Sequence, residues 1–343
     1  MIRADIKGLS AYHVPDAKGM IKLDAMENPY PLPETVRRAL AERLATASIH
    51  RYPDAAARRL RQRIATHEGV APEQVLIGNG SDEIIQMLIL AVKDGPCIAP
   101  APTFVMYEVI SRWLRRPYVP VPLEENFALD ADRFLHAASR ERARLAFLAC
   151  PNNPTGNLWE QDTIARIRDG FGGLLVIDEA YAPFSERNHL HLMGKRTAVL
   201  RTFSKLGWAG LRLGYLIADA ELIEHVNKVR LPYNINTLSQ LAAEVLFDHF
   251  EAFEAQAARI RDERARLARE LGGIPGAEVF PSQTNFITLR LPRAEQVFEH
   301  LLVSGILIKR LGGHPLLRDC LRITVGTREE NDRLLAALKE ACR

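Results

Sequence analysis

The sequence predicts an α/β fold, with a large domain built on a mostly parallel central sheet and a smaller α+β domain. Three observations lead to this expectation. The middle of the chain alternates short apolar runs with longer amphipathic stretches, which is the pattern of buried parallel strands and their covering helices. Several of the apolar runs end directly on polar or glycine-rich residues. Past about Leu231 the pattern changes to a long helical stretch followed by alternating strands.

Four apolar runs predict strands of the central sheet. Because open α/β sheets bind their ligands at the carboxyl ends of the strands, the polar residues after these runs predict where a site lies. The run 75–77 leads into the turn 78–82 and then into the helix 83–92. The run 145–149 leads into 150–156, the run 174–177 into 178–181, and the run 198–200 into 201–205.

The two ends of the chain are expected to form the smaller domain. The N-terminal segment through Ala39 carries three prolines between residues 29 and 33 and is not strand-like, so we expect it to cross and pack there. The expected C-terminal elements are a helical stretch over 237–271, strands near 285–289 and 321–325, and a final helix over 328–342. The predicted domains are residues 40–235, and residues 1–39 together with 236–343.

Composition and charge exclude several classes of protein. With 47% hydrophobic and 25% charged residues, the chain has the usage of a soluble globular protein. The net charge is only +3, and the arginine runs 58–63 and 112–116 lack interleaved aromatics, so we expect solvated helix faces and no nucleic-acid partner. No apolar run reaches the roughly 20 residues of a membrane span, and the first residues lack a signal-peptide core. We expect a cytoplasmic protein without a membrane partner.

The cysteines and histidines do not predict a metal site. Four cysteines are scattered along the chain without C-x-x-C spacing. His189 and His191 alternate without a nearby set of carboxylates or cysteines, which is more typical of loop residues than of ligands. We therefore expect neither a disulfide framework nor a bound metal ion.

Lys205 is the candidate for covalent chemistry. It follows a buried-looking strand and Ser204, and glycines stand at positions 207, 210 and 214 after it. In an interior loop its ammonium group would be desolvated and its pKa lowered, which is what Schiff-base formation requires. Spacing alone leaves the ordinary alternative open, because most lysines are solvated surface charges.

Asp178 ends an apolar run, where a carboxylate is costly to bury without a cationic partner. The pyridinium nitrogen of pyridoxal 5′-phosphate (PLP) is such a partner, and keeping it protonated preserves the cofactor as an electron sink. Tyr181 and Asn153 could both point at the ring oxygen of the same cofactor. The alternatives are a structural Asp178, capping a helix or pairing with an arginine, and an ordinary turn at 151–156.

The glycine-rich turn 78–82 suits a phosphate group. Glycine lets the backbone approach an anion closely, and the following helix presents unpaired N–H groups at its positive end. Ser81 could equally be a helix N-cap, and an aromatic such as Tyr107 is more often part of a core than stacked on a cofactor. The residues predicted to hold PLP are Gly80, Ser81, Asp82, Tyr107, Asn153, Asp178, Tyr181, Thr202, Ser204, Lys205 and Arg212.

This ordered set resembles the fold-type I PLP-dependent aminotransferases, and the resemblance spans nearly the whole chain. Within that superfamily the sequence is most similar to the histidinol-phosphate aminotransferase family. The segments that carry this similarity are 27–29, 51–53, 201–205, 209–215 and 321–327. One departure is visible, because Lys205 and Arg212 are seven positions apart where many relatives have eight.

The resemblance implies transamination of L-histidinol phosphate with 2-oxoglutarate, which yields imidazole-acetol phosphate and glutamate in histidine biosynthesis. It further implies a homodimer in which Tyr52 reaches the PLP phosphate of the partner subunit. Arg322 would hold the carboxylate of glutamate or 2-oxoglutarate. Arg310 and Tyr12 would bind the distal anion of the substrate, and Asn153 would also contact the substrate. Lys205 would act as the general base once it is displaced from the cofactor.

Three other functions stay open from the sequence. An aromatic amino-acid aminotransferase or a threonine-phosphate decarboxylase could keep every cofactor residue, because only the substrate-end residues distinguish them. A regulatory or binding protein could reuse the fold. Such proteins typically carry an appended DNA-binding domain, for which the short N-terminal segment leaves no room.

Overall fold

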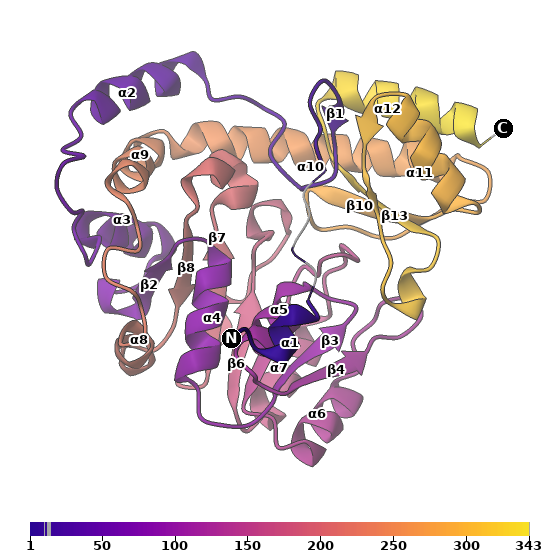
Figure 1. The fold of residues 1–343 in the computed structure, drawn as a ribbon. Helices are drawn as coiled ribbons and strands as arrows, with labels where there is room; N and C mark the ends of the chain where they lie inside the picture. Colours follow the sequence, from indigo (N-terminus) through magenta and orange to yellow (C-terminus); the bar gives the residue numbers. More distant parts are fainter. Residues whose placement is uncertain (10, 12–14, 343) are drawn as a thin grey trace.

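The computed structural model describes residues 1–9, 11 and 15–342, and it centres on a seven-stranded sheet (Figure 1). The strand order is β2-β8-β7-β6-β5-β3-β4. Among these strands only β8 runs antiparallel to its neighbours. The strands are β2 (Val75–Gly78), β3 (Cys97–Ala101), β4 (Tyr118–Pro122), β5 (Leu145–Ala149), β6 (Leu174–Asp178), β7 (Thr197–Thr202) and β8 (Gly214–Ile217). All four predicted apolar runs are therefore strands of one mostly parallel sheet, and the predicted fold class is confirmed.

Alternate residues of the central strands pack on opposite faces of the sheet. In β5, Leu145 and Phe147 pack with α4 and α5, whereas Ala146 and Leu148 pack with α6 and α7. Every residue of β5 and β6 is buried, as parallel strands covered on both faces require. The helices on the first face are α4 (Ser81–Ala91), α5 (Met106–Trp113) and α8 (Ala220–Asn227), and those on the second are α3 (Arg58–Glu68), α6 (Ala131–Arg140) and α7 (Gln161–Gly170).

A smaller four-stranded sheet is formed by the C-terminal part, in the order β12-β13-β10-β9. Its core includes Ile287 and Ile323 from the sheet and Leu271, Leu301 and Leu334 from three covering helices. The strands are β9 (Glu278–Val279), β10 (Phe286–Arg290), β12 (Lys309–Arg310) and β13 (Cys320–Thr324), and the helices are α10 (Phe250–Gly272), α11 (Ala294–Val303) and α12 (Arg328–Ala341).

The N-terminal segment contributes to both parts of the molecule. Its first helix is α1 (Ala4–Lys7), and its strand β1 (Ile21–Lys22) pairs in parallel with β11 (Ile306–Leu307), beside the smaller sheet. Its helix α2 (Glu34–Ala45) lies instead against α9 (Thr237–Asp248). We keep the predicted division at residues 40 and 235 as a proposal.

The helical stretch expected over 237–271 is two helices, α9 and α10, with a break at His249. The backbone of His249 has φ −125° and ψ 29°, which lies outside the helical region. The break lets the rings of Phe247 and Phe250 stack with their centroids 5.8 Å apart, and both rings meet Trp208 edge-on. Aromatic packing therefore overrides a helical pattern that is continuous in the sequence.

Candidate active site

A cavity of about 240 Å³ opens at the carboxyl ends of β5, β6 and β7. Ala25, Met26 and Glu27 of the N-terminal segment form one wall of it, and Phe104 lines another side. The structure brings together at this cavity nine of the residues singled out in the sequence, which are Ser81, Asp82, Asn153, Asp178, Tyr181, Thr202, Ser204, Lys205 and Arg212. Their convergence follows from the topology, because the ends of parallel strands meet at one edge of a sheet.

Lys205 lies in the π-helical turn Ser204–Trp208 that follows β7. Its Nζ atom is 3.4 Å from the carbonyl oxygen of Ala25 and 5.9 Å from the centre of the Tyr181 ring. Burial lowers the pKa of Lys205 to about 8, and the positive charge of Arg322 acts in the same direction. At pH 7 roughly a tenth of the amine is therefore neutral and nucleophilic, far more than for an exposed lysine.

Replacing Lys205 with methionine should stabilise the protein in the absence of a ligand. The pKa of Lys205 is about 8 when folded, against 10.5 for the unfolded side chain. The unfolded chain therefore binds more protons between these values, and stability rises with pH through this window. At pH 7 the cost of the buried ammonium group is at most about 3 kcal/mol, which Lys205→Met would recover.

Urea unfolding of the wild type and Lys205→Met at pH 7 and pH 10 measures the difference in their free energies of unfolding. This difference should be smaller at pH 10. The matched control is Lys339→Met, because Lys339 has a side chain that is 54% exposed and should show no such pH dependence. Equal stability of Lys205→Met and the wild type at pH 7 would contradict the assignment.

Asp178 is buried at the end of β6 and lacks an ion-pair partner among the described residues. Its Oδ2 accepts a hydrogen bond from the Tyr107 hydroxyl at 2.6 Å, and its Oδ1 accepts from the backbone N–H of Ala180 at 3.0 Å. Burial raises the pKa of Asp178 to about 6, although both hydrogen bonds oppose the shift. A buried carboxylate that is held this firmly fits a cationic ligand group such as a protonated pyridine nitrogen.

Tyr107 does not line the cavity, in contrast to the stacking position expected for it. Its ring is fully buried and stacks on Phe147, with centroids 4.7 Å apart and an interplanar angle of 6°. It lies in the first turn of α5, and its hydroxyl group donates a hydrogen bond to Asp178. The aromatic residue at the cavity is Phe104, three positions earlier, which the sequence reading missed. The signal for Phe104 was its position three residues after the end of β3, at the same edge of the sheet.

The other end of the cavity presents donors suited to a phosphate group. The backbone N–H groups of α4 begin at Ser81, which is the first helical residue and not the cap. Arg212 makes no ion pair with the residues the structure describes, and Thr202 and Ser204 share a hydrogen bond of 3.0 Å. Gly80 has φ +85°, and a Cβ there would come within 2.7 Å of Arg212 Nη2. Glycine at this position therefore leaves room for the guanidinium group.

The cavity thus fits PLP at both of its charged ends. Asp178 is positioned for a cationic group such as the protonated pyridine nitrogen. Arg212 and the start of α4 are positioned for an anionic group such as the phosphate. Asp82 adds a buried carboxylate oxygen, Oδ1, that lacks a hydrogen-bond partner in the described part of the chain. Such an acceptor needs a donor that a ligand or its water can supply.

The substrate-end residues divide into two groups. Arg322 is buried beside the cavity, where it donates to Asn153 Oδ1 at 2.5 Å and to the carbonyl oxygen of Asp24 at 3.0 Å. Arg310 is exposed and paired with Glu295, so its guanidinium group does not line the cavity. Tyr12 lies outside the described residues. The structure therefore brings Arg322, but not Arg310, to the predicted site.

Tyr52 also lies apart from the cavity of its own chain. Its side chain is 80% exposed, and its ring stacks on Tyr233 with centroids 4.5 Å apart. An exposed aromatic pair of this kind is unusual for a surface without a partner.

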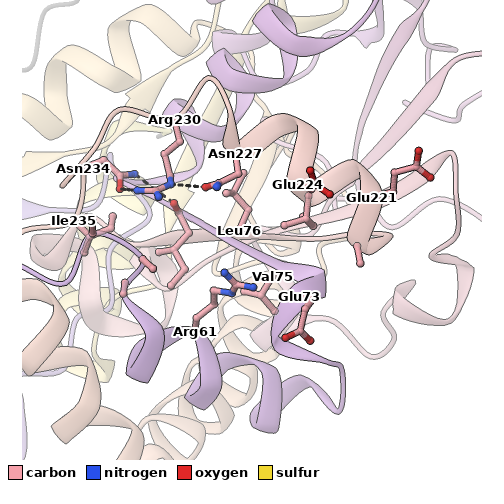
Figure 2. Close-up of a pocket in the computed structure, with 16 residues that line it drawn as sticks. Arg61, Glu73, Val75, Leu76, Glu221, Glu224, Asn227, Arg230, Asn234 and Ile235 are labelled. Atoms are coloured by element: carbon pink, nitrogen blue, oxygen red, sulfur yellow. Dashed lines mark hydrogen bonds between the residues drawn. The ribbon is translucent and has the colours of Figure 1, made fainter.

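The structure describes a larger cavity of about 460 Å³ elsewhere, between α3, α8 and the start of β2 (Figure 2). Arg230 donates there to Asn227 at 2.8 Å and to Asn234 at 2.9 Å. None of the residues predicted to bind the cofactor or the substrate is among those that line it. The chemistry-bearing groups therefore gather at the smaller cavity.

The described residues contain no cluster of three or more His, Cys, Asp or Glu side chains arranged to hold a metal ion. His189 is buried with its Nδ1 3.0 Å from Glu179, and His191 faces Gln161. None of the helices the structure describes has both the length and the apolar content to cross a bilayer.

The fold and this cavity define a class, the PLP-dependent aminotransferases of fold type I. The family described as aminotransferase class I and II matches residues 18–338, and this chain belongs to that family. It is similar to histidinol-phosphate aminotransferase 1 of Burkholderia lata, at 47% identity over 99% of this chain and 98% of the relative. It is also similar to the histidinol-phosphate aminotransferase of Methylibium petroleiphilum, at 44% identity over 98% of this chain and 94% of the relative.

Solved structures agree with this assignment. The histidinol-phosphate aminotransferase of Sinorhizobium meliloti, solved with PLP, superposes with a TM-score of 0.90 at 26% identity, covering 100% of this chain and 97% of that one. The L-threonine-O-3-phosphate decarboxylase of Porphyromonas gingivalis shares the fold, with a TM-score of 0.81 at 23% identity over 94% of this chain and 99% of that one. The chain is thus a PLP-dependent aminotransferase, as the sequence predicted.

Proposed function

We propose that this enzyme transfers the amino group of L-histidinol phosphate to 2-oxoglutarate, giving imidazole-acetol phosphate and glutamate in histidine biosynthesis. The observation that carries the proposal is 47% identity to a histidinol-phosphate aminotransferase over 99% of the chain. The burial of Arg322 beside the cavity supports it, because both substrates carry an anionic group. The L-threonine-O-3-phosphate decarboxylase of Porphyromonas gingivalis shares the fold at only 23% identity.

The proposed roles follow from the geometry at the cavity. When bound, PLP supplies the electron sink that acidifies the substrate carbon bearing the amino group. Lys205 Nζ removes and returns the proton of that carbon, since its lowered pKa leaves it partly neutral. Asp178 holds a proton on the pyridine nitrogen, and Tyr107 fixes the orientation of this carboxylate. Phe104 lines the cavity where it would contact the cofactor ring, and Tyr181 and Asn153 would contact the phenolic oxygen.

Substrate binding is assigned to a second set of residues. Arg322 holds the carboxylate of glutamate or 2-oxoglutarate, a task suited to a planar guanidinium group. It already bonds to Asn153, so one substrate group can contact both side chains. Arg310 and Tyr12 remain the proposed contacts of the distal phosphate, and Arg310 must then exchange Glu295 for the substrate.

The purified enzyme should turn over L-histidinol phosphate with a kcat/KM at least about tenfold above that for phenylalanine, each with 2-oxoglutarate. A difference of this size corresponds to about 1.4 kcal/mol of transition-state binding, which one phosphate contact supplies readily. Threonine phosphate serves as the third substrate and should release no carbon dioxide. If phenylalanine or threonine phosphate is the best substrate, the corresponding alternative function replaces the proposed one.

We further propose that the enzyme is a cytoplasmic homodimer in which Tyr52 reaches the PLP phosphate of the partner subunit. The exposed Tyr52–Tyr233 pair and the separation of Tyr52 from its own cavity support this arrangement. Four free cysteines are consistent with a reducing compartment. Sedimentation of the PLP-bound enzyme tests the dimer, and a monomer at micromolar concentration would contradict it.

A further inference from the structure

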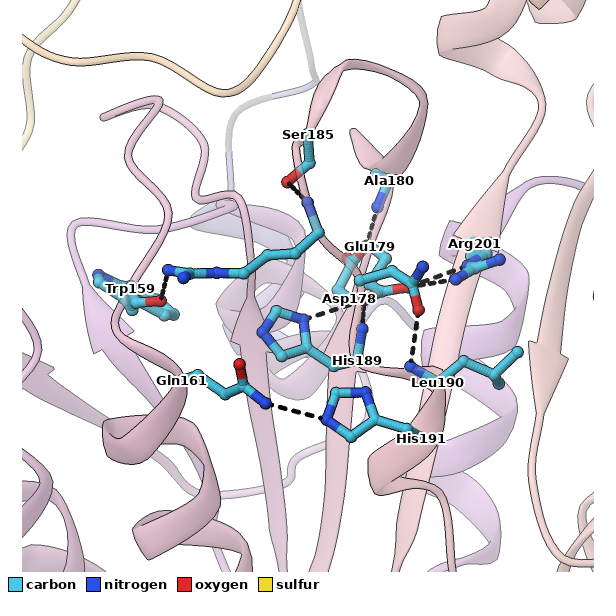
Figure 3. A network of polar contacts seen from close by, with 12 residues as sticks. Trp159, Gln161, Asp178, Glu179, Ala180, Ser185, His189, Leu190, His191 and Arg201 are labelled. Carbon is cyan, nitrogen blue, oxygen red and sulfur yellow. Dashed lines mark hydrogen bonds and ion pairs between the residues drawn. The ribbon is translucent and has the colours of Figure 1, made fainter.

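A buried set of ion pairs lies behind the lysine loop, which we define as residues 201–207. Arg201 donates from Nε and Nη2 to Glu179 Oε2, at 2.9 and 2.7 Å, and from Nη1 to Glu68. Figure 3 shows Glu179 between Arg201 and His189, whose Nδ1 lies 3.0 Å from Glu179 Oε1. One guanidinium group thus holds two carboxylates, and a histidine supports one of them.

These charges are well removed from solvent. The exposed fractions of the Arg201, Glu68 and Glu179 side chains are 12%, 5% and 1%. Burial pushes the pKa of Glu179 up, but the hydrogen bond with His189 and the charge of Arg201 outweigh it, so this pKa lies below its ordinary value. Losing the cation would leave two buried carboxylates facing each other without compensation.

Strand alternation places this set of ion pairs behind the cofactor cavity. Successive side chains of a strand point to opposite faces, so Glu179 points away from Asp178, and Arg201 points away from Thr202. Asp178 lines the active-site cavity, whereas Glu179 and Arg201 line a second cavity of about 390 Å³ behind it, and Thr202 borders both cavities. Each member of the Arg201–Glu179 pair is therefore one residue from a group that faces the cofactor.

We propose that Arg201 is a positioning residue whose ion pairs with Glu179 and Glu68 set the placement of Lys205 relative to Asp178. Asp178 is carried by β6 and Lys205 by the loop after β7, so the two hydrogen bonds from Arg201 to Glu179 Oε2 fix one strand end against the other. Glu68 ends α3 and ties the same guanidinium group to a third element. Arg201 itself lines no part of the active-site cavity and acts only through its neighbours.

The lysine loop is also held by core packing and by hydrogen bonds. Phe203 and Leu206 pack into the core, and both also border the 390 Å³ cavity. Residues 201 and 202 belong to β7 and pair with β8, and the carbonyl oxygen of Leu206 accepts a hydrogen bond from Asn28. The turn that carries Lys205 is irregular, with Gly207 at φ 124°. The ion pairs of Arg201 add a tie at the strand end that leads into this turn.

The test is Arg201→Lys in the PLP-bound enzyme. Lysine keeps the positive charge but cannot form the planar fork that reaches both carboxylates. We expect kcat to fall by about tenfold to a hundredfold, the scale of a small misplacement of reacting groups, while KM changes little. The pH midpoint of the visible absorption of the resting enzyme should also shift, because Lys205 and its surroundings determine it.

The matched control is Arg116→Lys. The Arg116 side chain is 9% exposed and ion-paired to Asp94, but it does not line the active-site cavity. We expect this variant to lose thermal stability while keeping the wild-type kcat and absorption midpoint. A merely structural role for Arg201 predicts the same behaviour for Arg201→Lys, and that result would overturn the proposal.

Glu179→Gln keeps the inference testable if Arg201→Lys does not fold. Glutamine preserves the shape and can still accept from Arg201, and the shift of the absorption midpoint is expected in the same assay. An unchanged midpoint together with an unchanged kcat in this variant would also overturn the proposal. The inference rests on the PLP-dependent activity and not on the donor, so a wrong substrate assignment leaves the absorption result unaffected.

Discussion

Lys205→Ala should lower transamination by more than about a thousandfold, because one change removes both the covalent attachment and the general base. The Nζ atom is enclosed near Tyr181 and Ala25, and among the residues the structure describes no other lysine lines this cavity. Turnover with the best donor measures the loss. Borohydride reduction of the PLP-bound wild type, followed by mass analysis of its peptides, should place the added mass on Lys205.

The control for this variant is Lys339→Ala, which removes an exposed lysine far from the cavity and should keep full activity. The Lys205→Ala protein should stay folded, since deleting a partly neutral amine removes little stabilising interaction. Covalent PLP on any other lysine of the wild-type enzyme would show the assignment to be wrong.

Asp178→Asn should lower kcat by about a hundredfold to a thousandfold, the scale of losing one preorganised electrostatic contact in a dry site. The amide cannot hold a proton on the pyridine nitrogen, so the electron sink weakens. Folding should be little affected, because the Asn side-chain oxygen can still accept from Tyr107 and the cost of burying a charge disappears. Steady-state kinetics and thermal unfolding together separate these two effects.

Asp178→Glu is the informative companion, because it keeps the charge but moves it by one methylene group. We expect it to retain more activity than Asp178→Asn. If Asp178→Asn has the wild-type kcat, Asp178 is a structural residue, as one of the alternatives from the sequence holds.

The strand-end residues could be predicted because two local rules locate them. A short apolar run identifies a buried strand, and parallel strands bring their carboxyl ends to one edge. These rules place Asp178, Lys205 and Asn153 at one edge of the sheet, although they come from three separate segments, and their shared chemistry then follows from the set. Arg212 required the resemblance as well, since nothing local distinguishes it from other arginines.

The remaining site residues depend on information that local patterns do not contain. Phe104 and Tyr107 are both aromatic and only three positions apart, and the start of α5 decides which of them faces the cavity. The split at His249 is set by ring packing with Trp208 from a distant segment. In the sequence, Glu179 and Arg201 are only the neighbours of Asp178 and Thr202. Their ion pair depends on β6 and β7 lying side by side in the folded sheet.

The bond between Arg322 and Asp24 joins residues 298 positions apart. During synthesis at about 5–20 residues per second, the pocket therefore lacks this wall until nearly the whole chain has left the ribosome. Lys205 and Asp178 emerge well before that, as parts of a sheet that can already form. A growing chain can thus assemble its cofactor-binding edge early, but it gains Arg322, the proposed contact of an anionic substrate, only at the end.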